Sequence, residues 1–556
     1  MQKLLKSLNQ QFPLRYLAWL GCGFGLAFTA FTWVIGAQGS WLALTFAALV
    51  LLGLRDVLQT RRAVLRNYPV IGHLRFFLEF IRPEIRQYFI ESDNEAVPFS
   101  RQQRSLVYQR AKGDPDKRPF GTQLDVSAGG YEWINHSLLP TAIASHDFRI
   151  TVGEGRAQPY SASVFNISAM SFGSLSANAI KALNAGARKG GFAHDTGEGS
   201  ISVHHRVNGG DLIWEIGSGY FGCRNEDGTF NAEKFSANAR DPQVKMIEIK
   251  LSQGAKPGHG GVLPGAKVTP EIAAARGVPV GVDCNSPASH SAFSTPTELM
   301  HFIQRLRDLS GDKPVGFKLC IGHPWEWFAL CKAMLSTGIT PDFIVVDGGE
   351  GGTGAAPLEF TNHVGTPLQE GLLLVHNTLM GLNLRDQIAI GCAGKVVSAF
   401  DIARLMALGA DWCNAARGYM FALGCIQAQA CHTGHCPTGV TTQDPLRQRA
   451  LVVGDKTERV YRFHHNTLFA LKELVQAAGL HHPSEITAAH IVRRVNGQDV
   501  RLLANLLPFL APGCLLNGDL PHAVYQAYWH LASPDSFAPQ GPLPAQLHGR
   551  ALAPAA

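Results

Sequence analysis

The apolar residues of this chain follow two different patterns, and the change between them falls at about Phe165. From there on, short runs rich in β-branched residues alternate with longer runs of helical periodicity, which predicts alternating strands and helices. The helical runs end at or near a glycine, the usual C-terminal stop. Eight runs are predicted as strands: 165–170, 191–197, 246–252, 278–284, 314–320, 342–348, 387–394 and 411–417.

Eight strands with helices between them predict an α/β chain that folds as a (β/α)8 TIM barrel. A doubly wound open sheet is the competing fold, but the count of eight and the polar motifs that follow the strands favour the barrel. In such a barrel the active site lies at the carboxyl ends of the strands. The segment 198–245 lacks the strand–helix rhythm, so we expect it to cover the mouth of the barrel.

The N-terminal part of the chain is continuously apolar, because no Asp, Glu, Lys, Arg or His occurs from Tyr16 to Leu54. A helix of about 20 apolar residues spans a bilayer, so residues of about 16–37 and 41–58 are predicted to form a transmembrane helical hairpin. A cleaved signal peptide is the alternative, but the apolar run is too long and has no clear small-residue cleavage site. Lysine and arginine flank both ends of the pair, which places both ends on the cytoplasmic side.

These patterns divide the chain into four parts. Residues 1–66 are the predicted membrane anchor, 67–164 a helical and irregular linker region, 165–445 the barrel and 446–556 a C-terminal helical extension. We therefore expect the protein at the cell (inner) membrane, with its catalytic domain in the cytoplasm. Cysteines in that reducing compartment are seldom disulfides and more often ligands or core residues.

Composition narrows the function classes. Hydrophobic residues make up 46% of the chain and charged residues 17%, which suits a large folded core. The formal charge of +6 is mild for 556 residues and the sequence has no basic stripe, so no nucleic acid partner is expected. The 58 glycines suit an α/β enzyme whose backbone approaches a ligand closely.

Three of the 11 cysteines stand close together in the run 424–439, "GCIQAQACHTGHCPTG". Cys425, Cys431 and Cys436 are separated by five and then four residues, and a proline follows the last one. One thiolate per iron is how iron–sulfur clusters are held, and a closing Cys–Pro pair is a known feature of such ligand sets. The spacing alone leaves two alternatives open: buried free cysteines, and a zinc site that uses His432 or His435.

Glycine-rich loops offer candidates for phosphate binding. The runs 217–222 and 349–354 both match G-x-G-x-x-G, but neither stands in the βαβ context that a dinucleotide site requires. The loops "GCAGK" (391–395) and "NAARG" (414–418) follow the predicted strands 7 and 8, the recurrent phosphate-binding corner of barrels. A flavin mononucleotide phosphate would fit there; ordinary barrel turns are the alternative.

Lysines in or near predicted strands suggest a binding site for an anion. Lys250 lies within a strand pattern, Lys256 follows six residues later in a glycine-rich loop, and Lys318 lies within another strand. A buried lysine is costly unless it meets an anion, so the pair Lys250 and Lys256 suits a dicarboxylate substrate. A lysine beside a flavin would also stabilise its reduced, anionic ring. For any one of these lysines alone, a structural ion pair is the simpler explanation.

Together these residues resemble the FMN-binding synthase domain of glutamate synthase, and in particular its membrane-tethered relatives that lack the glutaminase domain. The resemblance runs from about Asn166 to about Pro445. The motifs that carry it are "SAMSFGSLS" (168–176), "HDTGEGS" (194–200), "IEIKLSQGAKPGHGGVLPGAKV" (247–268), "VVDGGEGGTGAAP" (345–357) and "CIQAQACHTGHCPTGVTTQ" (425–443).

The resemblance implies a barrel that carries FMN and a 3Fe–4S cluster held by Cys425, Cys431 and Cys436. Reduced FMN would convert 2-oxoglutarate and ammonia, through 2-iminoglutarate, to L-glutamate, and the cluster would pass electrons to FMN. Lys250 and Lys256 would bind 2-oxoglutarate and act in catalysis. The residues implied in cofactor binding are Met170, Ser171, Gly173, Gln253, Lys318, Gly348, Gly349, Gly391, Gly394, Ala416 and Arg417.

The chain departs from the family pattern in ways that affect its partners. No glutaminase domain and no C-terminal β-helix domain are expected, so the amine would come as ammonia, as another amine donor or from a separate amidotransferase. Ferredoxin or a reductase subunit would serve as the external electron donor. His259 stands where the family usually has Glu. Two alternatives are amine transfer like that of N-methylglutamate synthase, and a membrane-bound flavin and iron–sulfur electron-transfer module.

Overall fold

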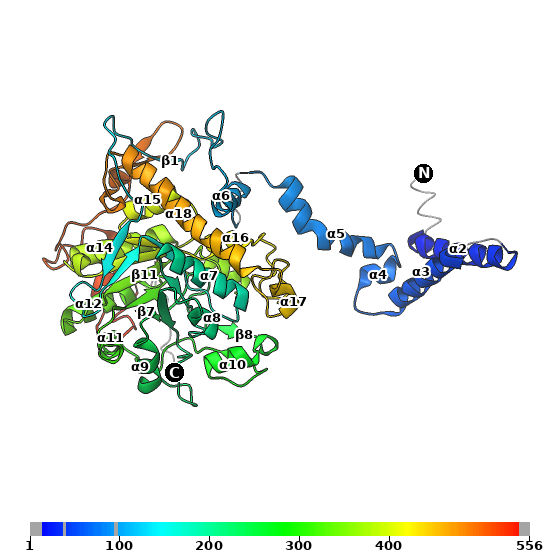
Figure 1. Cartoon of the computed structure of the whole chain (residues 1–556), viewed down its shortest axis with the longest axis horizontal. Coiled ribbons are helices and arrows are strands. Elements are labelled where there is room, and N and C mark those ends of the chain that lie inside the picture. The colour runs from blue at the N-terminus through cyan, green and yellow to red at the C-terminus, as the bar shows by residue number, and fades with distance from the viewer. Residues whose placement is uncertain (1–13, 37–39, 94–97, 544–556) are drawn as a thin grey trace. The chain divides into compact units, whose positions relative to one another are not determined.

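The computed structural model describes residues 14–36, 40–93 and 98–543, and the chain divides between residues 95 and 96 into two compact units (Figure 1). The first unit is helical. After a short 3₁₀ turn at Leu14–Tyr16, its elements are α2 (Leu17–Val34), α3 (Ser40–Leu58), α4 (Ala63–Asn67), α5 (Gly72–Ile85) and a π-helical turn at Arg86–Ile90.

Helices α2 and α3 pack closely against each other through small residues. The Trp19 ring covers Gly53 and its Nε1 donates a hydrogen bond to the Val50 carbonyl at 3.0 Å, while the Phe46 ring covers Gly25. Both helices are long and apolar enough to cross a membrane, and few of their residues are buried in the protein (6% and 11%). The core helix of a soluble protein would be mostly buried, so these helices present their apolar side chains outward.

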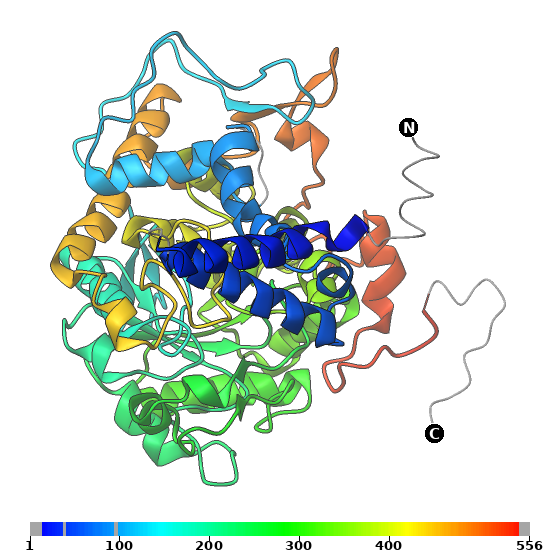
Figure 2. The same ribbon diagram turned by 90° about the vertical axis from the view of Figure 1, so that its right-hand side faces the viewer.

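The second unit contains a closed barrel of eight parallel strands (Figures 1 and 2). This confirms the predicted barrel. In chain order the strands are β4 (Phe165–Ile167), β5 (His194–Asp195), β6 (Leu212–Ile216), β7 (Val244–Lys250), β10 (Val315–Leu319), β11 (Phe343–Asp347), β12 (Ala389–Ala393) and β13 (Trp412–Ala415). The helices between and just after them are α7 (Ala177–Gly190), α8 (Val203–Arg206), α9 (Ala232–Ala239), α10 (Pro270–Arg276), α11 (Pro296–Ser310), α12 (Pro324–Thr337), α13 (Leu358–His363), α14 (Leu368–Gly381), α15 (Ala399–Ala407) and α16 (Arg417–Leu423).

Two strand predictions were wrong. The third barrel strand is β6, which lies inside the segment 198–245 that was expected to cover the mouth. The run 278–284 is not a barrel strand: Val280 and Val282 are more than half exposed, and Pro279 and Gly281 (φ 74°) suit a turn. Only Cys284 belongs to a strand, the two-residue β9 (Cys284–Asn285), which pairs with β8 (Val262–Leu263). The long loop over the barrel therefore follows β7.

Side chains alternate between the two faces of each barrel strand, as the pleat requires. The lower part of the interior is apolar and consists of Ala193, Ile213, Met246, Phe343, Val345 and Trp412. Residues of an antiparallel hairpin, β2 (Arg149–Val152) and β3 (Tyr160–Ser163), pack against this layer and close the N-terminal end of the barrel. The open end is consequently the one at the carboxyl ends of the strands.

Two glycines make room for the large rings of this layer. A Cβ on Gly391 would lie 2.4 Å from the indole of Trp412, and one on Gly316 would lie 2.2 Å from the carbonyl oxygen of Phe343. The Phe343 and Trp412 rings contact each other edge to face, with centroids 5.9 Å apart. Glycine at 391 is therefore required by packing inside the barrel.

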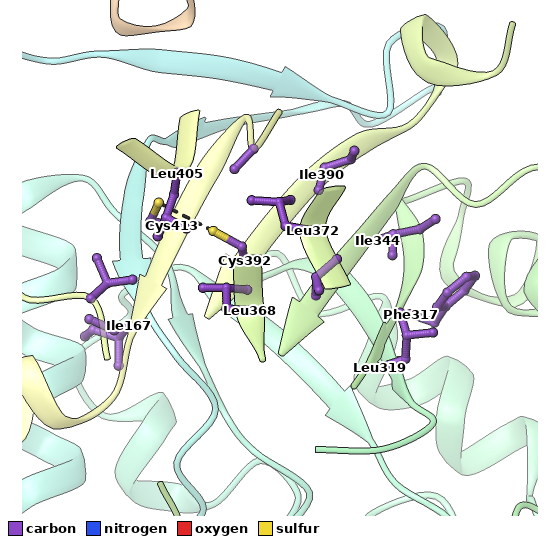
Figure 3. Close-up of a cluster of buried hydrophobic side chains, with 14 of the residues drawn as sticks. Ile167, Phe317, Leu319, Ile344, Leu368, Leu372, Ile390, Cys392, Leu405 and Cys413 are labelled. Carbon is purple, nitrogen blue, oxygen red and sulfur yellow. Dashed lines mark hydrogen bonds between the residues drawn. The ribbon is translucent and has the colours of Figure 1, made fainter. Parts of the chain in front are cut away.

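The outer face of the strands forms the main hydrophobic core with the surrounding helices (Figure 3). Ile344, Ile390 and Cys392 on the strands face Leu368 and Leu372 of α14. All of these side chains are at most 2% exposed, so burial of this face supplies the main hydrophobic stabilisation of the barrel.

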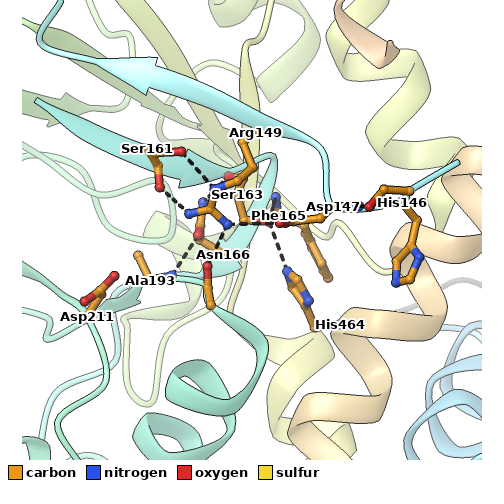
Figure 4. Close-up of polar contacts among 12 residues, drawn as sticks. His146, Asp147, Arg149, Ser161, Ser163, Phe165, Asn166, Ala193, Asp211 and His464 are labelled. Atoms are coloured by element: carbon orange, nitrogen blue, oxygen red, sulfur yellow. Dashed lines mark hydrogen bonds and ion pairs between the residues drawn. The ribbon is translucent and has the colours of Figure 1, made fainter. Parts of the chain in front are cut away.

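Polar side-chain contacts tie the first barrel strand, β4, to the segments beside it (Figure 4). The Asn166 side chain donates to the Ser163 carbonyl at 2.7 Å and accepts from the Ala193 amide at 2.9 Å. Ser163 Oγ also lies 3.0 Å from Nε2 of His464, on the long helix α18 (Val453–Ala477) that packs along α7. The region after the barrel thus contacts the barrel through α18.

The segments on either side of the barrel contain strands as well as helices. Before it come α6 (Arg101–Lys112), β1 (Glu132–Ile134) and the hairpin described above; after it come α17 (Pro445–Gln448), α18, β14 (Ile491–Arg494), β15 (Val500–Leu502), α19 (Leu503–Leu506) and α20 (Ala523–Tyr528). Strands β1, β14 and β15 form one small sheet. The C-terminal region is therefore mixed and not only helical.

The packing of Gly391 against Trp412 leads to a stability prediction. We expect Gly391→Ala to lower the free energy of unfolding by about 1–3 kcal/mol, because the added methyl group overlaps the buried indole. The measurement is thermal or denaturant unfolding of the full chain. Gly454→Ala, which adds its methyl group into open space in α18, is the matched control and should leave stability unchanged or slightly higher. Equal stability of both variants would contradict the packing role.

Candidate active site

A cavity of about 1280 Å³ opens at the carboxyl ends of the barrel strands. Its walls are the loops that follow the strands, together with the cysteine-containing segment after β13. Sites for small molecules commonly measure about 300–1,000 Å³. This cavity is large enough for a nucleotide-sized cofactor and a second, smaller molecule.

The structure brings most of the predicted site residues together in this cavity. Those that line it are Met170, Ser171, Lys250, Gln253, Lys256, Lys318, Gly349, Gly394, Ala416, Arg417, Cys425, Cys431 and Cys436. Three predicted residues are not among the lining residues: Gly391 packs on Trp412 inside the barrel, Gly348 packs on Leu368 and Glu350, and Gly173 occupies a turn at φ 104°.

A layer of charged residues, which we call the charged floor, lies between the cavity and the apolar layer, and three of its five members line the cavity. Five successive strands (β5, β6, β7, β10 and β11) each contribute one of them: Asp195, Glu215, Glu248, Lys318 and Asp347. Lys318 Nζ forms an ion pair with Glu215 and another with Glu248, the latter at 3.0 Å. All five side chains point to the inner face of the barrel, one step of the strand pleat above the apolar layer.

Burial controls the ionisation of this layer. It raises the pKa of Glu248 to about 7, with the neighbouring Glu215 adding to the effect and Lys318 opposing it. It also raises the pKa of Asp195 well above its usual value and that of Asp347 above its usual value. For Lys318 burial acts to lower the pKa, but Glu215 and Glu248 outweigh it and the pKa is raised. The ammonium of Lys318 therefore remains charged.

Higher in the cavity the balance of charge is reversed. Lys250 forms an ion pair with Glu198 at 3.0 Å. A structural ion pair, the alternative to anion binding that the sequence left open, therefore accounts for part of the role of this lysine. Lys256 and Arg276 are 7% and 4% exposed, and within the described ranges no carboxylate lies at ion-pair distance from either. Burial opposes ionisation of Glu198, yet Lys250, Arg276 and Lys256 together lower its pKa. Three cations therefore surround one carboxylate, which suits binding of an anion.

The loop after β7 reaches across the cavity to the helix after β11. His259 of this loop lines the cavity, donates from Nδ1 to the Gly260 carbonyl at 2.6 Å and contacts the Phe360 ring of α13 edge to face. The ring centroids are 5.4 Å apart. This contact ties the loop after β7 to α13 beside the cavity.

The three cysteines face the same cavity from the loop after α16. Cys425 and Cys436 are buried and Cys431 is half-buried, with Arg417 Nη1 3.7 Å from its Sγ. Burial raises the pKa of Cys425, and the other two thiols are close enough to contribute. Burial acts the same way on Cys436, but hydrogen bonds involving Thr438 and Thr441 lower its pKa to about 7. Such an environment favours the thiolate that an iron centre requires.

Several functional residues were not found from the sequence. Arg276 and Glu198 lie in helices or loops far apart in the chain, and only the fold places them beside Lys256. The acidic residues of the floor could have been found, because Glu215 and Glu248 each interrupt an apolar run at the C-terminal half of a strand. A charge at such a position in a barrel points to the site.

Comparison with known proteins agrees with these features. A family model described as a conserved region in glutamate synthase matches residues 137–481. The glutamate synthase large subunit-like protein YerD of Bacillus subtilis (strain 168) is 38% identical over 496 residues, which cover 82% of this chain and 94% of that protein. The archaeal-type glutamate synthase (NADPH) of Thermotoga neapolitana is 36% identical over 284 residues, 51% of this chain and 53% of that protein.

Among solved structures, a mutant flavocytochrome b2 with pyruvate bound matches 80% of this chain and 91% of that chain with a TM-score of 0.38 and 12% identity, a likeness too distant to carry an argument. The sequence relatives are decisive, since one of them is matched over nearly its whole length. The chain belongs to the glutamate synthase family and is a glutamate synthase-type oxidoreductase.

Proposed function

We propose that the protein makes L-glutamate by reductive amination of 2-oxoglutarate. Ammonia, or another amine donor, condenses with the keto group, water leaves and 2-iminoglutarate forms; a hydride and a proton then convert the imine to the amine. When bound in the cavity, FMN would supply the hydride and a 3Fe–4S cluster would supply electrons from an external donor one at a time. The residues of the chain hold the substrate and set the charges around it.

The surplus of positive charge around Glu198 is the observation that carries this proposal. Lys250, Lys256 and Arg276 exceed the single carboxylate by two charges, and they converge on a space inside the cavity. A substrate with two carboxylates matches that surplus, and charge-assisted hydrogen bonds would fix its orientation. A module that only transfers electrons has no need of such a pocket.

The residues present fit a flavin nucleotide. Gly394 has no side chain at the wall of the cavity, and Lys395 and Arg417 add positive charge beside it. Arg417 Nη2 is held by the Thr353 carbonyl at 2.5 Å, which directs the guanidinium along this wall. We propose that this corner takes the phosphate and that Met170, Ser171 and Gln253 border the ring.

The cysteines fit an iron–sulfur cluster better than one metal ion. In the part of the chain that the structure describes, the only set of three or more possible ligand atoms within 4.8 Å of one another is that of Asp195, Glu215 and Glu248, so the three sulfurs are spread more widely. A cluster with one thiolate on each of several irons needs such a spread. Cys431 is the most exposed of the three cysteines. We propose that ferredoxin or a reductase subunit docks near Cys431, because electrons would have the shortest path to the cluster there.

The substrate proposal predicts the effect of removing a cation. We expect Lys256→Met and Arg276→Met each to raise the apparent KM for 2-oxoglutarate by roughly 10–100-fold, because each variant loses one charge-assisted hydrogen bond to the substrate. The assay follows reoxidation of dithionite-reduced flavin on addition of 2-oxoglutarate and ammonium.

Lys189→Met is the control, because this exposed lysine pairs with Glu458 on the surface of α7. It should leave the KM unchanged. If neither 2-oxoglutarate nor ammonium affects flavin reoxidation in the wild type, the synthase proposal fails.

The cluster proposal predicts metal content. The purified wild type should contain about three iron and about four labile sulfide per chain, and Cys431→Ser should lose most of both. Cys22→Ser, in helix α2 of the other unit, should leave them unchanged. Iron binding that survives Cys431→Ser would count against this ligand set.

We also propose that the first unit anchors the protein in a membrane. In support, α2 and α3 expose large apolar side chains such as Phe24 (83%), Phe28 (65%) and Trp41 (67%). Helix α5 is amphipathic, with Leu74, Phe77, Leu78 and Ile81 on one face. Arginines follow α3, and a basic, amphipathic segment beside a membrane span suits the headgroup region of anionic lipids.

This proposal predicts contact with lipid at defined positions. A photoreactive phenylalanine analogue at Phe28 or Phe77 of the full chain, reconstituted in phospholipid vesicles, should crosslink to lipid on illumination. The same analogue at Phe120, an exposed loop residue of the second unit, is the control and should not. Absence of lipid adducts at Phe28 would refute the membrane span, and absence at Phe77 alone would refute the interfacial position of α5.

A further inference from the structure

The charged floor of the cavity has an excess of acid. The carboxylate oxygens of Asp195, Glu215 and Glu248 lie within 4.8 Å of one another, and all three residues are at most 2% exposed. Lys318, itself 4% exposed, is their cationic partner and pairs with two of them. Its ammonium supplies the positive charge that a metal ion would supply in such a group, so the cluster is not a metal site.

Among the described residues, the charged groups that act most strongly on this cluster all lie on barrel strands. The barrel strands contribute Asp195 from β5, Glu215 from β6, Glu248 and Lys250 from β7, Lys318 from β10 and Asp347 from β11. Lys250 is already paired with Glu198. Four carboxyl groups therefore share one ammonium, and an uncompensated buried carboxylate is expensive. Electroneutrality requires that the group binds protons.

The cluster meets the water-accessible cavity through some of its members. Of the charged layer, Glu215, Lys318 and Asp347 line the cavity, whereas Asp195 and Glu248 do not. On the other side of them lies the apolar layer with Ile213, Met246 and Val345. Of the groups that line the cavity, Glu215 and Lys318 lie against Glu248, so they give a proton bound at Glu248 a direct path to the cavity.

We propose that Asp195, Glu215 and Glu248 form a proton store that exchanges protons with the cavity through Glu215 and Lys318. This inference rests on the proposed reductive amination and assigns its proton. Reduction of the imine needs a hydride, which the flavin would deliver to carbon, and one proton, which is added to nitrogen. The store supplies that proton and is refilled from water in the cavity. Glu248 is thus a positioning residue that acts through Glu215 and Lys318.

The direct test is an infrared measurement that needs no turnover. The difference spectrum between the wild-type chain and Glu248→Gln at pH 6 should contain the carbonyl band of a protonated carboxylic acid, and the band should decrease as the pH rises through about 7. Glu458→Gln, a surface carboxylate paired with Lys189, is the control and should show no such band. Absence of the band from the Glu248 spectrum at pH 6 would overturn the proposal.

The pH dependence of thermal stability gives a second, independent measurement of proton binding by Glu248. A carboxyl group whose pKa is raised in the folded state destabilises the fold progressively as the pH rises from its unfolded value to its folded value. The wild type should therefore lose thermal stability relative to Glu248→Gln between about pH 4.5 and pH 7. A constant difference between the two proteins over this range would contradict proton storage.

Kinetics separate this inference from the proposed function. If the enzyme aminates 2-oxoglutarate, wild-type kcat should fall above about pH 7, and Glu248→Gln should have a lower kcat without this pH dependence and with an unchanged KM. Amination with identical pH profiles in both proteins would refute the proton store and leave the synthase proposal intact. No amination, with the infrared band present, would refute the synthase proposal alone.

Discussion

Charges buried inside the closed barrel must be balanced where they stand, and the rest of the site depends on this constraint. Lys318 is held by carboxylates from neighbouring strands, and these are placed by the same pleat that turns Ile213 and Met246 to the apolar layer below. The ionic layer in turn separates the packed interior from the cavity. One regular alternation of side chains thus provides both a dry base and a charged floor.

The barrel could be predicted because most of its strands are β-branched runs followed by helices that end at glycine. The third strand could not, because Glu215 interrupts its apolar run and the sequence gives no sign that Lys318 compensates the charge. The run 278–284 has the residue types of a strand but no neighbour to pair with. Register and partners, which are properties of the whole sheet, decide both cases.

For the site, the sequence identified the residues whose types and spacing are unusual, such as the cysteines, Lys256 and Arg417, and the fold brings them to one cavity. From the sequence, Gly391 was assigned to cofactor binding. A glycine at this position can make room either for a cofactor or for a neighbouring side chain, and only the position of Trp412 shows that it makes room for the indole. Arg276 and Glu198 were missed because their role arises from convergence in space. Spacing along the chain reveals local ligand sets, whereas pockets of opposite charge require the tertiary structure.

The hairpin β2–β3 determines from which end of the barrel small molecules reach the cavity. Because it packs against the lower end of the barrel, the cavity opens at the opposite end, among the loops that follow the strands. A substrate would enter and a product would leave from that end, where His259 lies on the cavity wall. A molecule bound there would therefore hold in place whatever lies deeper in the cavity.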